Sequence, residues 1–112
     1  MTDFLQVTTA TVEAERLAAS LIERRLAGCV QIIGPVQSVY HWQGQIERAE
    51  EWLLVIKTTV SQYAAVESAI RELHSYDCPE IIATPIVAGS KDYLAWLSAA
   101  CASGDSLKPP RS

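Results

Sequence analysis

The 112-residue sequence lacks the features of several protein classes. No apolar run approaches the roughly 18 to 20 residues that a membrane helix needs, and the longest, Trp52 to Ile56, has the length of a strand. The first residues, Met1 to Phe4, carry neither a basic segment nor a long apolar stretch, so we expect no signal peptide. With five glycines and five prolines, the chain is neither collagen-like nor a flexible linker.

Cysteine and positive charge are also scarce. The three cysteines, Cys29, Cys78 and Cys101, are far apart and include no Cys-x-x-Cys pair, which argues against a zinc knuckle and favours reduced thiols in the cytoplasm. Lys and Arg total 9 against 13 Asp and Glu, so the net charge is −4 and a nucleic-acid backbone would not be neutralised. We expect a cytoplasmic protein that binds no nucleic acid and no membrane.

Catalytic motifs are missing as well. The sequence contains no Gly-x-Ser-x-Gly, no His-Glu-x-x-His and no glycine-rich phosphate loop, and its two histidines leave little for acid–base chemistry. The sequence therefore predicts that the protein is not an enzyme and requires no cofactor.

The composition that remains is that of one globular domain. Apolar residues make up 49% and charged residues 20%, and a chain of this length buries enough surface for a core. We expect a single domain over residues 1–102. Residues 103–112, with Gly104, Pro109 and Pro110, are predicted to form a disordered tail.

Apolar periodicity predicts alternating strands and helices. The expected elements are a strand at 4–8, a helix at 11–27 capped by Thr11 and Gly28, strands at 29–33, 36–42 and 50–59, a helix opened by Ser61, a strand at 80–88 and a helix at 91–102 opened by Ser90. Gly34-Pro35 predicts a bend, a bulge or a break between two strands, and Gln43-Gly44 predicts a hairpin turn.

The order β-α-β-β-α-β plus a terminal helix is that of a split β-α-β, ferredoxin-like fold of the α+β class. In this fold an antiparallel sheet carries both helices on one face, so its second face is open. Tyr40, Trp42, Trp52 and the apolar run around Leu54 supply more apolar surface than two helices cover. This excess predicts self-association.

Five blocks of the sequence resemble the CutA divalent-cation tolerance family. They are Arg25-Leu26-Ala27-Gly28-Cys29-Val30-Gln31-Ile32, Ser38 to Ile46, Glu51 with Ile56-Lys57-Thr58, His74 to Ile82, and Tyr93 to Leu97. They follow the family's order over about residues 4–101. The resemblance implies a cytoplasmic, PII-like homotrimer without an established reaction, linked to tolerance of copper and other divalent metals.

The resemblance also implies where a metal would bind. In some members copper binding is associated with a cysteine on the first strand and two histidines near a helix end, and here these positions are Gln6, Leu73 and His74. We therefore expect only weak binding of Cu²⁺ or Zn²⁺, with His74, Cys29 and Cys78 as candidate ligands. The alternatives are a buried, inert Cys29 and a surface His74 that complements the dipole of a helix C-terminus.

A further set of polar and aromatic residues predicts a cleft between subunits. Lys57 ends an apolar run, so its ammonium group must extend to solvent or meet a carboxylate. The set predicts either an ion-pair network that holds the trimer or, alternatively, a PII-like signalling pocket for a small anionic ligand. Its members are Tyr40, Trp42, Glu51, Lys57, Tyr76, Glu80, Tyr93 and Trp96.

Overall fold

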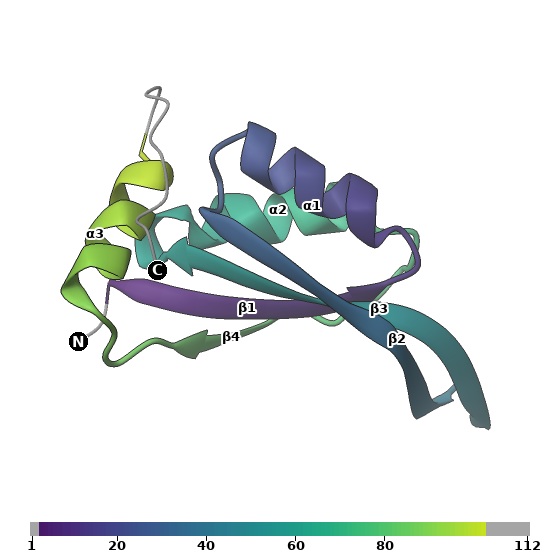
Figure 1. Cartoon of the computed structure of the whole chain (residues 1–112). Helices are drawn as coiled ribbons and strands as arrows, with labels where there is room; N and C mark the ends of the chain where they lie inside the picture. Colours follow the sequence, from purple (N-terminus) through teal and green to yellow (C-terminus); the bar gives the residue numbers. More distant parts are fainter. Residues whose placement is uncertain (1–2, 103–112) are drawn as a thin grey trace.

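The computed structural model describes residues 3–102, and the expected tail at 103–112 lies outside this range (Figure 1). The elements are β1 (Phe4–Thr11), α1 (Ala14–Glu23), β2 (Cys29–Trp42), β3 (Gln45–Thr59), the 3-10 helix η1 (Val60–Gln62), α2 (Tyr63–Leu73), β4 (Ile82–Pro85) and α3 (Lys91–Ala100). The predicted order of strands and helices and the α+β class are confirmed.

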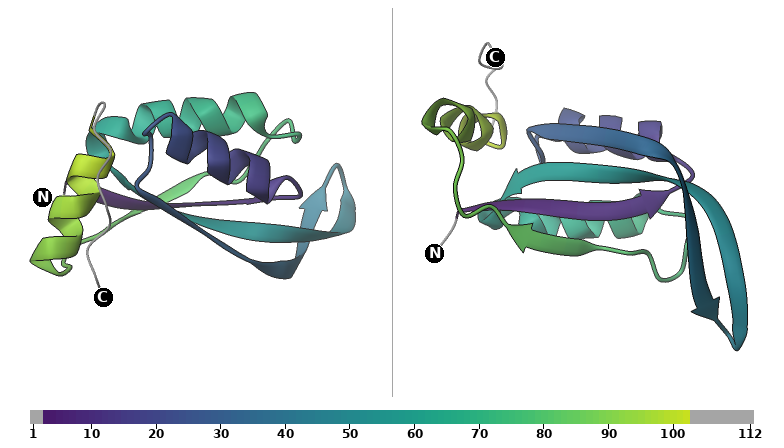
Figure 2. Two further views of the ribbon diagram at one scale, coloured as in Figure 1. Left: turned by 45° about the horizontal axis from the view of Figure 1, so that its top comes forward. Right: turned by 60° about the horizontal axis from the view of Figure 1, so that its bottom comes forward.

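The four strands form one antiparallel sheet in the order β2-β3-β1-β4. Strand β3 separates β1 from β2, which is the arrangement expected for a split β-α-β unit. Helices α1 and α2 lie on one face of the sheet, and α3 lies beside the end at which β1 begins (Figures 1 and 2). In the part of the chain that the structure describes, the opposite face carries no helix.

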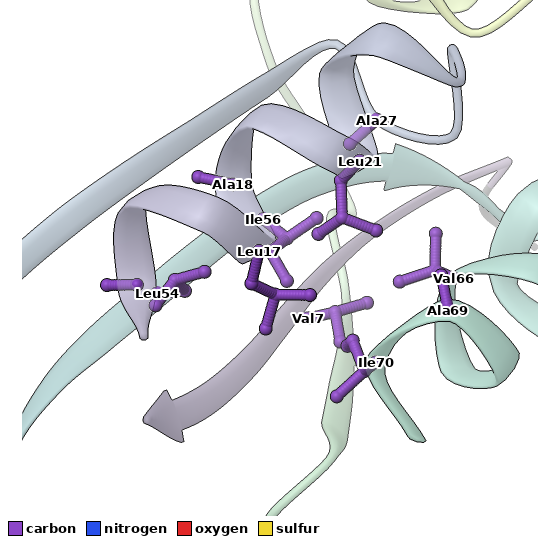
Figure 3. Close-up of a cluster of buried hydrophobic side chains, with 11 residues drawn as sticks. Val7, Leu17, Ala18, Leu21, Ala27, Leu54, Ile56, Val66, Ala69 and Ile70 are labelled. Atoms are coloured by element: carbon purple, nitrogen blue, oxygen red, sulfur yellow. The ribbon is translucent and has the colours of Figure 1, made fainter. Parts of the chain in front are cut away.

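The core fills the space between the sheet and the two helices (Figure 3). Val7 of β1 and Leu54 and Ile56 of β3 are fully buried there against Leu21 of α1 and Ile70 of α2. Burying each such side chain stabilises the fold by about 1.5–3 kcal/mol. Further members of the cluster are Ala14, Leu17, Ala18, Ala27, Val66 and Ala69.

Helix α1 is shorter than the predicted helix at 11–27, and neither predicted cap is correct. Thr11 belongs to β1, where it pairs with Trp52, and its Oγ1 accepts a 3.0 Å hydrogen bond from the Glu13 amide. The strand extends to Thr11 because β3 continues to supply hydrogen-bonding partners, and this pairing prevails over local helix signals.

The C-terminus of α1 is closed by Arg25 instead of Gly28. Arg25 adopts a left-handed conformation with φ of 58°, and the amides of Arg25 and Leu26 bond to the carbonyls of Ile22 and Leu21. These two bonds form a Schellman motif. Gly28 has another role, because a Cβ atom there would lie 2.6 Å from Leu97 Cδ1 of α3.

Of the three options for Gly34-Pro35, the structure has the bulge. Strand β2 is continuous, and three steps from Ile33 to Val36 match two steps from Leu53 to Glu51 on β3. The predicted turn at Gln43-Gly44 is also present, with φ values of 51° and 80° that are typical of hairpin turns. The two long strands extend beyond the helices as a bent arm (Figure 2).

The second half of the chain departs from expectation at three boundaries. Ser61 lies within η1 and does not cap α2, which has no side-chain cap at Gln62. Strand β4 covers Ile82–Pro85, not 80–88, because its pairing with β1 spans only Leu5 to Thr8. Helix α3 ends at Ala100, but its predicted cap is confirmed, since Ser90 Oγ accepts a 3.2 Å hydrogen bond from the Tyr93 amide.

The open face of the sheet is apolar, but two of the residues predicted for it lie elsewhere. Leu54 faces the helices and is fully buried, and Trp52 packs against the same core. Alternation along β3 places Leu53 and Val55 on the open face, where they are half-buried. Their neighbours on that face include Ile33 and Ile82, which are 50% and 54% exposed.

Candidate functional site

A cleft of about 670 Å³ lies between the arm and the loop that follows α2. We call it the acidic cleft. Six of the residues singled out in the sequence line it, namely Tyr40, Trp42, Glu51, Tyr76, Cys78 and Glu80. Asp77, which is not one of the predicted ligands but stands between Tyr76 and Cys78 in the polar turn after His74, also lines it.

The bulge in β2 determines which side chains of the arm reach the cleft. After the bulge, Val36 pairs with Glu51, and Ser38, Tyr40 and Trp42 follow on the same side at a spacing of two. Without the extra residue at Gly34-Pro35, Tyr40 and Trp42 would point to the other side. The bulge therefore brings the two aromatic rings to the side of Glu51.

Glu51 and Tyr76 form the buried part of the cleft. Glu51 is only 4% exposed. Burial, followed by the hydrogen bond to Glu51 and by its negative charge, raises the pKa of Tyr76 to about 12. The phenol of Tyr76 therefore stays protonated at neutral pH and donates a hydrogen bond to the Glu51 carboxylate.

His74 holds the loop that carries Tyr76. Its Nε2 lies 2.7 Å from the carbonyl oxygen of Ala10, and its Nδ1 accepts a 3.1 Å hydrogen bond from the Tyr76 amide. The side chain is 8% exposed, so the alternative interpretation as a surface histidine is wrong. Since a neutral imidazole has one donor and one acceptor, both ring nitrogens are engaged in this arrangement.

The remaining predicted site residues lie at the other end of the sheet. Cys29 pairs with Lys57 across β2 and β3, and Lys57 Nζ donates a 2.8 Å hydrogen bond to Gln31 Oε1. Burial, followed by the electrostatic interaction and the hydrogen bond with Cys29, raises the pKa of Tyr93. The ring of Tyr93 lies 5.5 Å from that of Trp96.

The predicted residues thus form two groups rather than one. Six positions separate Glu51 from Lys57 along β3, which corresponds to about 20 Å of extended strand. Lys57, Tyr93, Trp96 and Cys29 do not line the acidic cleft. The predicted metal ligands His74, Cys29 and Cys78 are not brought together either, since residues 3–102 contain no group of three His, Cys, Asp or Glu side chains suited to a metal ion.

The charges of the cleft have one sign. Glu51, Asp77 and Glu80 line it, and no Lys, Arg or His side chain within residues 3–102 does so. A ligand in this cleft faces a negative potential, which favours cations and disfavours anions. The arrangement does not favour the anionic ligand of the alternative interpretation.

None of the helices in residues 3–102 is long and apolar enough to span a membrane.

Comparison with known proteins shows similarity to the CutA proteins. The family model described as CutA1 divalent ion tolerance protein matches residues 4–100. The divalent-cation tolerance protein CutA of Thermus thermophilus is 39% identical over 98 residues, which cover 87% of this chain and 95% of that protein. The CutA of Archaeoglobus fulgidus is 40% identical over 98 residues, with the same shares of the two chains.

Solved structures agree with this match. The crystal structure of CutA1 from Oryza sativa has a TM-score of 0.85 and 37% identity, covering 88% of this chain and 94% of that one. The Thermus thermophilus structure has a TM-score of 0.84 and 36% identity, covering 87% and 97%. The chain therefore belongs to the CutA1 divalent ion tolerance protein family.

Proposed function

We propose that this protein is a non-enzymatic, cytoplasmic homotrimer that contributes to divalent-cation tolerance by binding copper or zinc weakly. The relatives are named for tolerance of divalent cations. The observation that carries the proposal is the composition of the cleft, which is lined by the acidic residues Glu51, Asp77 and Glu80 and by no basic residue of 3–102. The three free cysteines support a reducing compartment.

Cys78 is the leading candidate for a metal ligand. It is exposed at the rim of the cleft, next to Asp77 and close in sequence to Glu80. A thiolate prefers copper and zinc to magnesium. Binding is expected to be weak because no third ligand of the usual kind stands beside these groups within residues 3–102.

His74 and Cys29 are weaker candidates on geometric grounds. A metal at His74 would have to displace the Tyr76 amide from Nδ1 or the Ala10 carbonyl from Nε2. Cys29 is half-buried and neighbours the positive charge of Lys57, which opposes binding of a cation.

The open face of the sheet supports the proposed trimer. Ile33, Leu53, Val55 and Ile82 form apolar surface on a face that no helix covers within residues 3–102. Soluble proteins cover large apolar surfaces of this kind by association. Sedimentation at micromolar concentration should give a mass three times the 12.3 kDa of one chain, and a mass of one chain would contradict the proposal.

Titration calorimetry tests the metal site. We expect micromolar or poorer affinity for Cu²⁺ and Zn²⁺, hardly any binding of Mg²⁺, and weaker binding at low pH because the thiol must lose its proton. Cys78→Ser should weaken Cu²⁺ binding about tenfold, whereas His74→Ala and Cys29→Ser should change it less. Nanomolar binding, or an isotherm that Cys78→Ser leaves unchanged, would contradict this assignment.

A further inference from the structure

An acidic and a basic residue mark the two ends of one face of β3. Alternation along the strand places Glu51 and Lys57 on the open face of the sheet, with Leu53 and Val55 between them. Ala10, which pairs with Leu53, lines the acidic cleft together with Glu51, so the cleft opens onto this face. Each subunit therefore carries an acidic group at one end of its open face and a basic group at the other.

The acidic end is incomplete within one subunit. Glu51 is 4% exposed, and no ion pair within residues 3–102 includes it. Tyr76 donates one hydrogen bond to its carboxylate, and this phenol is a neutral donor. A buried carboxylate is normally paired with a cation, because removal from water disfavours its charged form. A cation from outside the subunit would complete the site.

The basic end is incomplete in the opposite sense. Lys57 is half-buried, and no ion pair within residues 3–102 includes it either. Its Nζ donates a 2.8 Å hydrogen bond to Gln31 Oε1, which carries no charge. An ammonium group has three donors, so Gln31 occupies only one of them. Lys57 therefore has the capacity to bind a carboxylate as well.

The two groups do not meet within one subunit. Six positions of β3 separate Glu51 from Lys57, which corresponds to about 20 Å of extended strand. In a closed ring of three identical subunits, however, every contact is head-to-tail and joins two different patches. Contacts that juxtapose opposite charges are favoured and those that juxtapose like charges are disfavoured. The proposed trimer can therefore bring the basic end of one open face to the acidic end of the next.

The other basic groups are less suited to this role. Arg16, Arg24 and Arg71 each pair with a carboxylate of their own subunit. Arg48 points to the other side of β3 from Glu51, because an odd number of residues separates the two along the strand. Lys57 shares the open face with Glu51 and is the basic residue that a contact through this face would bury.

We propose that Lys57 of one subunit enters the acidic cleft of the next subunit and forms an ion pair with Glu51 of the partner subunit. The inference rests on the proposed trimer and deepens it, because the cleft then becomes complete only on assembly. Asp77 and Glu80 are exposed, so the buried Glu51 gains most from a cation.

Charge reversal tests the pair. Lys57→Glu and Glu51→Lys should each raise the dissociation constant of the trimer at least about tenfold, because like charges then meet. The double variant Glu51→Lys with Lys57→Glu inverts the pair in every contact and should restore the trimer in sedimentation experiments. A double variant that dissociates as readily as Lys57→Glu alone would overturn the proposal.

A matched control separates the pair from the net charge. Glu23→Lys combined with Lys57→Glu has the same net charge as the double variant, but Glu23 is an exposed residue at the end of α1. This combination should not restore the trimer. Equal recovery in both combinations would refute a specific contact between Glu51 and Lys57.

Chemical cross-linking covers the case in which the reversed variants fail to fold. Glu51→Cys and Lys57→Cys are combined in a chain that also carries Cys29→Ser and Cys78→Ser, and the protein is treated with a short bismaleimide. The two new thiols are about 20 Å apart along β3, so a short reagent joins only thiols of different subunits. Denaturing gels should show covalent trimers for this variant and not for either single cysteine.

The result also distinguishes the pair from the trimer itself. Single-chain bands from a protein that sediments as a trimer would overturn the pairing of Glu51 with Lys57 and leave the trimer standing. A wild-type protein that sediments as a single chain would overturn both.

Discussion

Strand β3 is apolar on both faces of the sheet, but its side chains are more deeply buried on one face than on the other. On β3, Leu54 and Ile56 point toward α1 and α2 and are fully buried, whereas Leu53 and Val55 point away from the helices and remain half-buried. The run from Trp52 to Ile56 is apolar on both sides, but the described chain covers only one of them. The comparison teaches that an unbroken apolar strand can serve the fold with one face and association with the other.

We expect the largest loss of stability from a substitution on the face of the sheet that the helices cover. Leu54→Asp would place a charge in a core position with 0% exposure, far from any cation of the cluster. We expect a loss of unfolding free energy of about 3 kcal/mol or more, sufficient to unfold a marginally stable domain. Chemical denaturation followed by circular dichroism measures this, and a loss below about 1 kcal/mol would contradict the assignment of Leu54 to the core.

Leu53→Asp is the matched substitution on the open side. It introduces the same charge one residue away, on the face without helices, so the subunit should keep its fold while the proposed trimer dissociates. Sedimentation should show a single-chain mass with a native circular dichroism spectrum. A trimer that tolerates Leu53→Asp would place the contact between subunits elsewhere.

The raised pKa of Tyr76, whose hydroxyl bonds to Glu51, predicts that the stability of the protein depends on pH. Its pKa is raised to about 12 in the folded state from 10.0, mainly by burial and then by Glu51. The unfolded state therefore loses the proton first, and the stabilisation, complete below pH 10, is lost as the pH rises toward about 12. The unfolding free energy of the wild type should therefore fall across this range relative to that of Tyr76→Phe, as measured by chemical denaturation, and identical pH profiles of the two proteins would contradict the assignment.

The smallest effect is expected in α3, which belongs to neither face. Ser90 Oγ accepts a 3.2 Å hydrogen bond from the Tyr93 amide and caps the helix. Ser90→Ala should cost about 1 kcal/mol of unfolding free energy. The control Ser98→Ala, at an exposed position inside the same helix, should be close to neutral, and equal effects of the two would argue against the cap.

Much of the fold could be predicted because its signals are local. The spacing of Leu17 and Leu21 predicts α1, Gln43-Gly44 predicts the hairpin, and Ser90 predicts the start of α3. Element boundaries were less accurate where strand pairing competes with local signals, as at Thr11. The left-handed conformation of Arg25 has no sequence signal of its own, because a glycine three residues later is the more common helix terminator.

The candidate site was predicted only in part. The residues of the acidic cleft were selected by their chemistry, but they were grouped with Lys57, Tyr93 and Trp96, which lie at the other end of the sheet. Sequence patterns indicate that Lys57 needs a polar partner, yet they do not identify it. The partner within the chain is Gln31 on the neighbouring strand, 26 residues away.

By itself, the sequence determined the order of strands and helices, the turn of the arm and the excess of apolar surface, since periodicity and turn chemistry act over a few residues. Only the tertiary structure decided that Leu54 lies in the core while Leu53 does not, and that His74 holds Tyr76 beside Glu51. The first outcome depends on the register of β3, and the second depends on the path of the loop that follows α2. Contacts of this kind join residues far apart in sequence, so no local pattern specifies them.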